Sequence, residues 1–442
     1  MDPSLYKFEL SPTTWVYQAS LLTIAIFFRF NRLASVRNLD LVLIVLLAPG
    51  PLLVAQGASL GPQVERWGYL WLMGVGGLLF VRLFVDALLV RRPLLEPNLS
   101  PAALTFLGLS LLAFLSVAVA TYPVTANDLE GARRADQLLQ FGQNDPAAQP
   151  MHGPGYPLLH LLAGIPSKAL IESSSDLPAA EQDKLQHLAT LRGTAIVSHL
   201  AIVIGLVVIG YRHFANLRTG IAAAALYLLV PYTALMAGRA DHLLPAALLV
   251  WAVALYRRPL LAGVFIGLAI GVVYYPAFLL PLWLSFYWSR GRGRFVSGVV
   301  VTLLALAVSL LLTSDSFDTF LAQFRDMFRW TTVQEGVPAG FWTVVDPAYR
   351  LPVATLLVAM SLSLALWPAR KNLGTLISCS AGVMLATQFW APQEGGLYVA
   401  WYLPLLLLTV MRPNLEDRIA LTVLSESRFR RRKPQLYVAQ AA

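Results

Sequence analysis

Long apolar segments separated by short polar turns run along almost the whole chain. One of them is AALTFLGLSLLAFLSVAVATY, residues 102–122. A transmembrane helix needs about 20 consecutive apolar residues, whereas the strands of a transmembrane β-barrel alternate between two environments over about ten residues. The pattern therefore predicts an all-α fold, a polytopic bundle of transmembrane helices.

The same periodicity predicts about thirteen spans, within a range of about 11–13. They lie near 13–30, 39–56, 68–90, 101–122, 192–211, 219–237, 241–256, 259–274, 276–288, 295–313, 351–368, 373–390 and 397–411.

The apolar run 259–288 is open to two interpretations, one long tilted helix or two short helices broken at Tyr275-Pro276. Proline inside a helix removes a hydrogen bond and clashes with the preceding turn. Basic loops of a membrane protein stay in the cytoplasm. The basic cluster at 290–294 joins the other basic turns on that side only if the run crosses twice, so we predict the break.

Composition agrees with a membrane protein, because 57% of the 442 residues are hydrophobic and only 13% are charged. The formal net charge of +9 would suit a nucleic-acid partner, but the basic residues lie mostly in short loops and in the tail RFRRRKP, residues 428–434. This distribution predicts cytoplasmic loops and a cytoplasmic C-terminus, and it excludes nucleic acid as the expected partner.

Two long polar segments, 123–191 and 314–350, fall on the outer side in this topology. The second contains SFDTFLAQFRDMFRW, residues 316–330, which places apolar side chains on one helical face: Phe317, Phe320, Leu321, Phe324, Met327 and Phe328. We expect a helix lying flat in the outer interface. The alternative is an amphipathic helix that packs on the bundle. A second short interfacial helix is expected at 129–141.

Asp128 directly follows the span that ends at Tyr122-Pro123. An Asn or Asp at this place suits the N-cap of the helix 129–141, which would hold the carboxylate at the membrane–water boundary. A carboxylate so placed can act as a general base on a hydroxyl group. A capping role alone is the alternative.

Other polar residues of the predicted outer side extend this candidate site. They are Arg133 and Arg134 after Asp128, His152 and Tyr156 in the stretch HGPGYPLLH, the turn residues Arg239, Asp241 and His242, and Arg350. Arginine suits phosphate recognition. Each arginine alone is more often a residue that contacts solvent or lipid headgroups, but several at one depth, with acids and histidines, indicate a substrate site.

No cofactor is expected. His152 and His160 are eight residues apart, which is not a clear ligand pattern for a metal, so a divalent ion is a minor alternative. His199 is interpreted as a hydrogen-bonded core residue. Arg82 and Asp86 have the i, i+4 spacing that permits pairing, and we interpret them as side chains that snorkel toward the cytoplasmic end.

The order of these features resembles the GT-C superfamily of membrane glycosyltransferases, which includes protein O-mannosyltransferases, lipid A aminoarabinose transferases and bacterial polyprenol-phosphate-dependent mannosyl- and arabinosyltransferases. An Asp in the first external loop matches Asp128, and HGPGYPLLHLL, residues 152–162, resembles a later Pro-rich element. GRADHLL and AGVFIGLA, within 238–281, resemble a later stretch that leads to a broken helix. The resemblance covers about 100–290.

The resemblance implies three regions. Residues 1–100 form an N-terminal addition of three spans, residues 101–411 the catalytic module, and residues 412–442 a basic cytoplasmic tail.

It also implies an inverting transferase that moves a sugar from a polyprenyl-phosphate donor to a hydroxyl of a glycan, lipid or protein acceptor. The enzyme would reside in the bacterial inner membrane with its site facing outward. Asp128 would be the base, and arginine would stabilise the departing phosphate. A multispan transporter or lipid-linked-sugar flippase is the alternative, and a scaffold subunit without activity is a third hypothesis.

Overall fold

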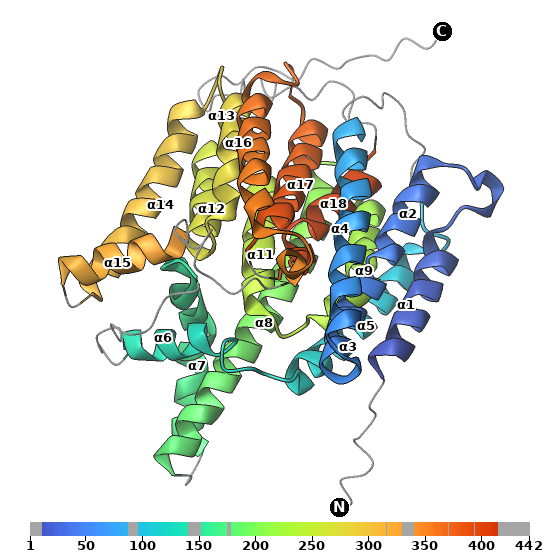
Figure 1. The fold of residues 1–442 in the computed structure, drawn as a ribbon. Coiled ribbons are helices and arrows are strands. Elements are labelled where there is room, and N and C mark those ends of the chain that lie inside the picture. Colours follow the sequence, from blue (N-terminus) through green and yellow to red (C-terminus); the bar gives the residue numbers. More distant parts are fainter. Residues whose placement is uncertain are drawn as a thin grey trace, which may run out of the picture.

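The computed structural model describes residues 11–86, 96–139, 152–174, 178–314, 316–328, 340–369, 371–392 and 394–413. Long helices stand side by side as a bundle, and shorter helices lie across one end of it (Figure 1). The predicted polytopic helical membrane bundle is confirmed.

The α-helices are α1 (Pro12–Phe27), α2 (Val36–Leu46), α3 (Pro49–Leu60), α4 (Pro62–Val85), α5 (Pro101–Thr121), α6 (Glu130–Leu139), α7 (Gly155–Ser174), α8 (Ala179–Arg212), α9 (Leu217–Leu229), α10 (Pro231–Leu235), α11 (Ala240–Ala254), α12 (Pro259–Val272), α13 (Leu280–Phe286), α14 (Arg292–Leu312), α15 (Phe317–Phe328), α16 (Arg350–Leu366), α17 (Leu373–Trp390) and α18 (Leu403–Met411). Short 3₁₀ helices are η2 (Phe30–Arg32), η4 (Tyr275–Leu279), η6 (Gly340–Thr343), η7 (Pro347–Tyr349) and η8 (Val399–Trp401).

Among the described residues, seven helices are long and apolar enough to cross a membrane, and four shorter apolar helices accompany them. The predicted span 39–56 falls on two helices, α2 and α3, because Pro49 and Pro51 open a new helix after a short break. A proline fits the first turn of a helix, where its missing N–H is not needed. The exact number of membrane crossings stays a prediction.

The predicted break in 259–288 is present. Helix α12 ends at Val272, and η4 begins at Tyr275 with Pro276 in its first turn. The hydroxyl of Tyr287, which follows α13, donates to the carbonyl of Tyr256, which precedes α12, at 2.5 Å. The two ends of the segment therefore lie together, so the chain runs from the basic turn at 257–258 along α12 and returns along η4 and α13.

The described basic turns meet at one end of the bundle, which we call the basic end. Arg218 donates to the carbonyls of Pro97 and Leu99, each at 3.1 Å, and Arg29 pairs with Glu96 at 3.5 Å. The predicted outer helices α6, α7 and α15 lie at the opposite end, which we call the site end (Figure 1). Arg91, Arg92, Arg370 and the tail 414–442 lie outside the described residues.

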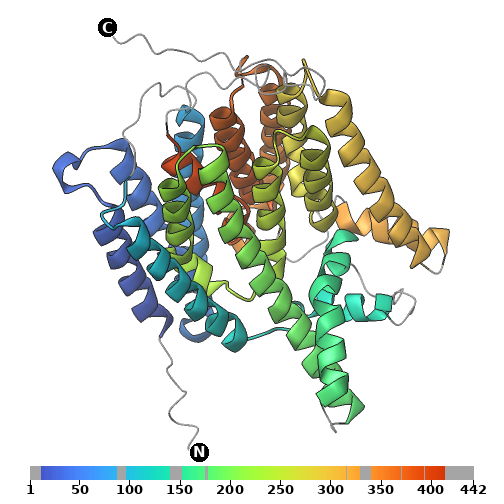
Figure 2. The same cartoon turned by 180° about the vertical axis from the view of Figure 1, so that it is seen from behind.

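At the site end, α7 and the first turns of α8 project beyond the bundle (Figure 2). Asp136 of α6 ties these helices together, because its carboxylate accepts from Gln186 of α8 at 2.7 Å and from Lys168 of α7 at 3.3 Å. The helix predicted at 129–141 is thus present as α6, fixed to the external helices by polar contacts.

Helix α15 turns its apolar face outward. Phe317, Leu321 and Phe324 are exposed, whereas Gln323 is buried and accepts a hydrogen bond from Ser314. An exposed apolar face favours the predicted interfacial helix over packing of that face on the bundle. Contact with lipid stays a prediction.

The third predicted span, α4, packs on a late helix of the chain. Phe84 of α4 lies against Gly382 of α17, and Asp86 pairs with Arg412 at 2.8 Å. These helices share one hydrophobic core with the rest of the bundle. The division of the chain at residue 100 stays a prediction.

Candidate active site

Arg239 stands at the centre of a group of carboxylates at the site end. It precedes α11, and its Nε and terminal nitrogen donate to the two carboxylate oxygens of Asp241 at 3.1 and 2.9 Å. A terminal nitrogen also donates to Glu394 at 2.9 Å, and Nε lies 3.5 Å from Oδ1 of Asp128. We call Arg239, Asp128, Asp241 and Glu394 the Arg239 cluster.

The Arg239 cluster contains three carboxylates and one guanidinium, so ionised acids leave it with an excess of two negative charges. Burial disfavours the charged guanidinium, but the neighbouring carboxylates of Asp241 and Glu394 outweigh burial and hold the pKa of Arg239 above its ordinary value. Arg239 therefore stays charged, and it is shared among acids within the protein.

Asp128 closes the turn before α6. Its Oδ2 accepts from the backbone N–H and the hydroxyl of Thr125, at 2.8 and 2.7 Å, while Oδ1 faces Arg239. The expected N-cap on α6 is therefore wrong in its detail, because the carboxylate turns back to Thr125. The Asp128 side chain is 8% exposed.

The first turn of α11 is fixed by aromatic side chains. Nδ1 of His242 and the hydroxyl of Tyr232 are hydrogen-bonded at 2.7 Å, and the His242 ring lies 4.6 Å from the ring of Tyr398. The indole of Trp401 donates to the carbonyl of Asp241 at 3.2 Å. These contacts hold Asp241 in place beside Arg239.

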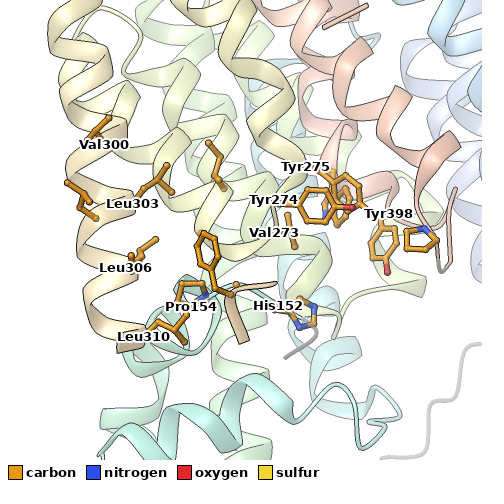
Figure 3. A pocket seen from close by; sticks show the side chains of 18 residues that line it. His152, Pro154, Val273, Tyr274, Tyr275, Val300, Leu303, Leu306, Leu310 and Tyr398 are labelled. Carbon is orange, nitrogen blue, oxygen red and sulfur yellow. The ribbon is translucent and has the colours of Figure 1, made fainter. Parts of the chain in front are cut away.

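A cavity of about 450 Å³ opens beside the Arg239 cluster. Its walls are apolar side chains of α12 and α14, such as Ile270, Leu303 and Leu306. Figure 3 shows Tyr274, Tyr275 and Tyr398 on the opposite side from α14, and His152 below them. Because Tyr398 lies within electrostatic reach of Glu394, Asp241 and Arg239, the polar mouth of the cavity borders the Arg239 cluster.

The segment His152–Gly155 reaches this mouth through a close backbone contact with the end of α12. The N–H of Gly153 donates to the carbonyl of Val272 at 2.9 Å. A Cβ on Gly153 or Gly155 would collide with the backbone of Gly271, so only glycine permits the approach. The Gly/Pro cluster of the sequence thus serves to bring His152 to the cavity.

Glu130 organises the polar residues around His152. Its carboxylate lies 3.2 Å from Nδ1 of His152 and 3.2 Å from Arg134 one helical turn away. The His152 ring stacks on Tyr156 at 4.2 Å. Tyr156 is buried, and burial raises the pKa of its phenol well above the ordinary value, so the hydroxyl stays protonated.

His160 lies behind Tyr156, with ring centroids 4.5 Å apart. Burial lowers the pKa of His160 to about 4, so the ring is neutral near pH 7. Its Nδ1 is hydrogen-bonded to the carbonyl of Tyr156 at 2.9 Å. This histidine supports Tyr156 from inside the protein.

The structure thus brings most predicted site residues into two neighbouring groups. Asp128, Arg239, Asp241 and His242 form one group, and Arg134, His152 and Tyr156 surround Glu130 in the other. Tyr156 lies within electrostatic reach of Asp241 and Asp128, so the groups are adjacent. Their roles in substrate binding stay predictions.

Two predicted residues lie apart from these groups. Arg133 is exposed on α6, and no contact joins it to the Arg239 cluster among the described residues. Arg350 is the first residue of α16, is 5% exposed, and lies within electrostatic reach of Tyr274 and Tyr275. Their predicted contacts with substrate are not tested by this arrangement.

Sequence analysis missed Glu130, Glu394 and Tyr398. Glu394 has a positive φ of 50°, a conformation uncommon for residues other than glycine, and it stands in the turn PQEGG just before the last span. A charged residue in a Gly/Pro-rich turn at the predicted outer side was the available signal. Tyr69 of α4 also lies within electrostatic reach of Glu394, so an N-terminal helix borders the site.

Among the described residues, no group of three or more His, Cys, Asp or Glu side chains is arranged to hold a metal ion. A requirement for a divalent ion is not tested by this observation.

The family model of glycosyltransferase family 87 matches residues 183–390. This is a GT-C-type family of membrane glycosyltransferases, so the resemblance to the GT-C superfamily is confirmed. The matched range contains Arg239, Asp241, His242 and Arg350, and it begins after Asp128 and His152. No curated protein and no solved structure matches the chain.

Proposed function

We propose that this membrane glycosyltransferase moves a sugar from a polyprenyl-phosphate donor to an acceptor hydroxyl, with inversion at the sugar, on the outer face of a bacterial inner membrane. The observation that carries the proposal is the apolar cavity whose polar mouth borders the Arg239 cluster and Asp128. A lipid tail and a reacting headgroup would meet at this junction.

The cavity suits the donor because its walls are apolar and reach the outer surface of the bundle. Val300 and Leu304 line it, and their side chains are 45% and 59% exposed on α14. In a membrane this face of α14 contacts lipid, so an isoprenoid chain can enter from the side. A water-soluble nucleotide sugar would gain nothing from such a wall.

Asp128 supplies the base in the proposed reaction. The acceptor oxygen forms a bond to the anomeric carbon, and its proton passes to the Asp128 carboxylate. The bond between the anomeric carbon and the phosphate oxygen breaks, and the electron pair stays on the lipid phosphate. Attack opposite the leaving group inverts the sugar.

The charge distribution supports the proposed outer location. The described basic turns meet at the basic end, opposite the Arg239 cluster, and positively charged loops favour the cytoplasm. A transporter or flippase remains the functional alternative, but the family match is to transferases.

The test is turnover in membranes supplied with a panel of radiolabelled polyprenyl-phosphate sugars. Asp128→Asn keeps the size of the side chain and removes the base, so we expect turnover to fall roughly 10²- to 10⁴-fold with unchanged membrane insertion. Asp346→Asn is the matched control, because Asp346 is an exposed aspartate that caps η7 at 2.9 Å, and it should retain wild-type turnover.

Turnover by the Asp128→Asn variant at the wild-type rate would overturn the base assignment. Failure of the wild-type protein to consume any donor of the panel would instead overturn the donor class. Labelling of an introduced surface cysteine on α6 only from the cytoplasmic side would overturn the outer location.

A further inference from the structure

The cavity needs a positive group if it is to hold the phosphate of the proposed donor. Among the described residues that line it, His152 is the one side chain able to carry a positive charge. Arg239, the residue first expected to hold phosphate, is already shared by three carboxylates. An incoming phosphate would add a further negative charge to that cluster, so His152 is the better placed group.

The His152 ring is held on three sides. Nδ1 lies 3.2 Å from the Glu130 carboxylate, one face stacks on Tyr156, and the next residue, Gly153, is anchored to Val272 by a backbone hydrogen bond. Because Nδ1 is engaged by Glu130, Nε2 is the ring nitrogen left for a ligand in the cavity. A hydrogen on Nε2 could then be donated to an anionic oxygen of a ligand in the cavity.

We propose that His152, positioned by Glu130, binds the phosphate of the lipid donor through Nε2–H. The inference rests on the proposed polyprenyl-phosphate donor and assigns its phosphate to the cavity mouth rather than to Arg239. His152 is then a catalytic residue that touches substrate, and Glu130 is a positioning residue that holds the ring and its charge.

The contact strengthens during the reaction. The donor phosphate is a diester with one negative charge, and it leaves as a monoester after the anomeric carbon–oxygen bond breaks. The electron pair of that bond raises the phosphate charge by one, while the acceptor proton goes to Asp128. A hydrogen bond from Nε2–H to the departing oxygen is stronger for the larger charge, which lowers the barrier.

Binding of farnesyl phosphate to the purified full-length protein in lipid nanodiscs tests the proposal apart from turnover. His152→Gln keeps a polar side chain but loses the charge. We expect its affinity for farnesyl phosphate to fall roughly 10- to 100-fold, the range for a charge-assisted hydrogen bond, while farnesol binds as it does to the wild type. His152→Arg restores a positive charge and should recover part of the affinity.

Two further variants separate positioning from general damage. Glu130→Gln should weaken farnesyl phosphate binding and leave farnesol binding unchanged. His187→Gln is the matched control, because Nε2 of His187 lies 3.6 Å from an Asp136 carboxylate oxygen on the external helices, outside the cavity lining. It should bind farnesyl phosphate as the wild type does.

Wild-type affinity in His152→Gln would overturn the assignment, as would an equal loss of farnesyl phosphate and farnesol, which indicates a distorted cavity. Competition by inorganic phosphate at the same concentration would point to free phosphate and also overturn it. The Asp128→Asn variant should still bind farnesyl phosphate, so failure of the base assignment is distinguishable from failure of this inference.

Discussion

The two ends of the bundle each bury a cluster of charges, and the clusters are built differently. At the basic end, Arg82 contacts both carboxylate oxygens of Asp40 at 2.6 and 2.8 Å and pairs with Asp86 at 2.9 Å. Asp86 in turn pairs with Arg412 at 2.8 Å. Two guanidinium groups thus pair with two carboxylates, and a third, that of Arg37, lies within electrostatic reach of Asp40 and donates to the carbonyl of Arg412 at 3.0 Å. At the site end, the single guanidinium of Arg239 contacts three carboxylates.

The two clusters differ in the solvent exposure of their carboxylates as well as in their net charge. The Asp40 and Asp86 side chains at the basic end are at most 1% exposed. Glu394 at the site end is 37% exposed beside an open cavity. A closed cluster with a guanidinium for each carboxylate joins helices, whereas a cluster with excess carboxylates at a cavity mouth stays partly exposed.

The basic-end cluster corrects one interpretation of the sequence. The i, i+4 pairing of Arg82 with Asp86 is present, but snorkelling toward the membrane surface is wrong, because Arg82 is 8% exposed. Its partner Asp40 lies 42 residues earlier on α2, a contact that local spacing does not reveal.

Of the substitutions that distinguish the two clusters, we expect Arg82→Met to lower the stability of the folded protein most. Removing one member of a buried ion network leaves carboxylates without a partner, so the folded state should lose about 3–5 kcal/mol. Thermal unfolding in detergent measures the loss, and turnover per folded molecule should stay near wild type. Arg212→Met is the control, because Arg212 is exposed near the same end. Equal stability of both variants would contradict a joining role.

A smaller effect on stability and a larger one on turnover are expected from Arg239→Lys. Lysine keeps the charge but lacks the planar fork that contacts Asp241 through two nitrogens. We expect kcat to fall roughly 10- to 100-fold, as for loss of a charge-assisted hydrogen bond. Steady-state kinetics checks this, with Arg212→Lys at the basic end as control, because Arg212 is exposed. Unchanged kinetics would remove Arg239 from the site.

The smallest effect is expected from Glu394→Gln. Glu394 is partly exposed, and the pair it forms with Arg239 is screened by water, so the loss of stability should stay below about 1 kcal/mol. Turnover should fall several-fold, since Arg239 loses one of the groups that hold it. A fall in melting temperature as large as that of Arg82→Met would show that both clusters contribute equally to the stability of the fold.

Much of the fold was predictable because its signals are local. Apolar length located the helices, and Pro276 together with the basic residues 290–294 predicted the reversal after α12. The same local signals placed Asp128, His152 and Arg239 at the site end. The orientation of the Asp128 carboxylate could not be predicted in this way. Both the first turn of α6 and Thr125 offer it a backbone N–H, and it accepts from Thr125.

Contacts between distant segments could not be predicted in this way. Glu394 meets Arg239 across 155 residues, and Glu130 meets His152 across a stretch of 22 residues. No repeating pattern links such positions, so they emerged only from the packing. The family match also begins at residue 183, and thus it gives no information on Asp128 or His152.

The backbone contact of Gly153 with Val272 has a consequence for protein engineering. This hydrogen bond holds the segment that carries Asp128 against α12, the helix that forms part of the cavity wall. A chimera that exchanges residues 123–182 between related enzymes must therefore keep glycine at position 153. A side chain there would collide with the backbone of Gly271 and push the segment of Asp128 away from the wall of the cavity.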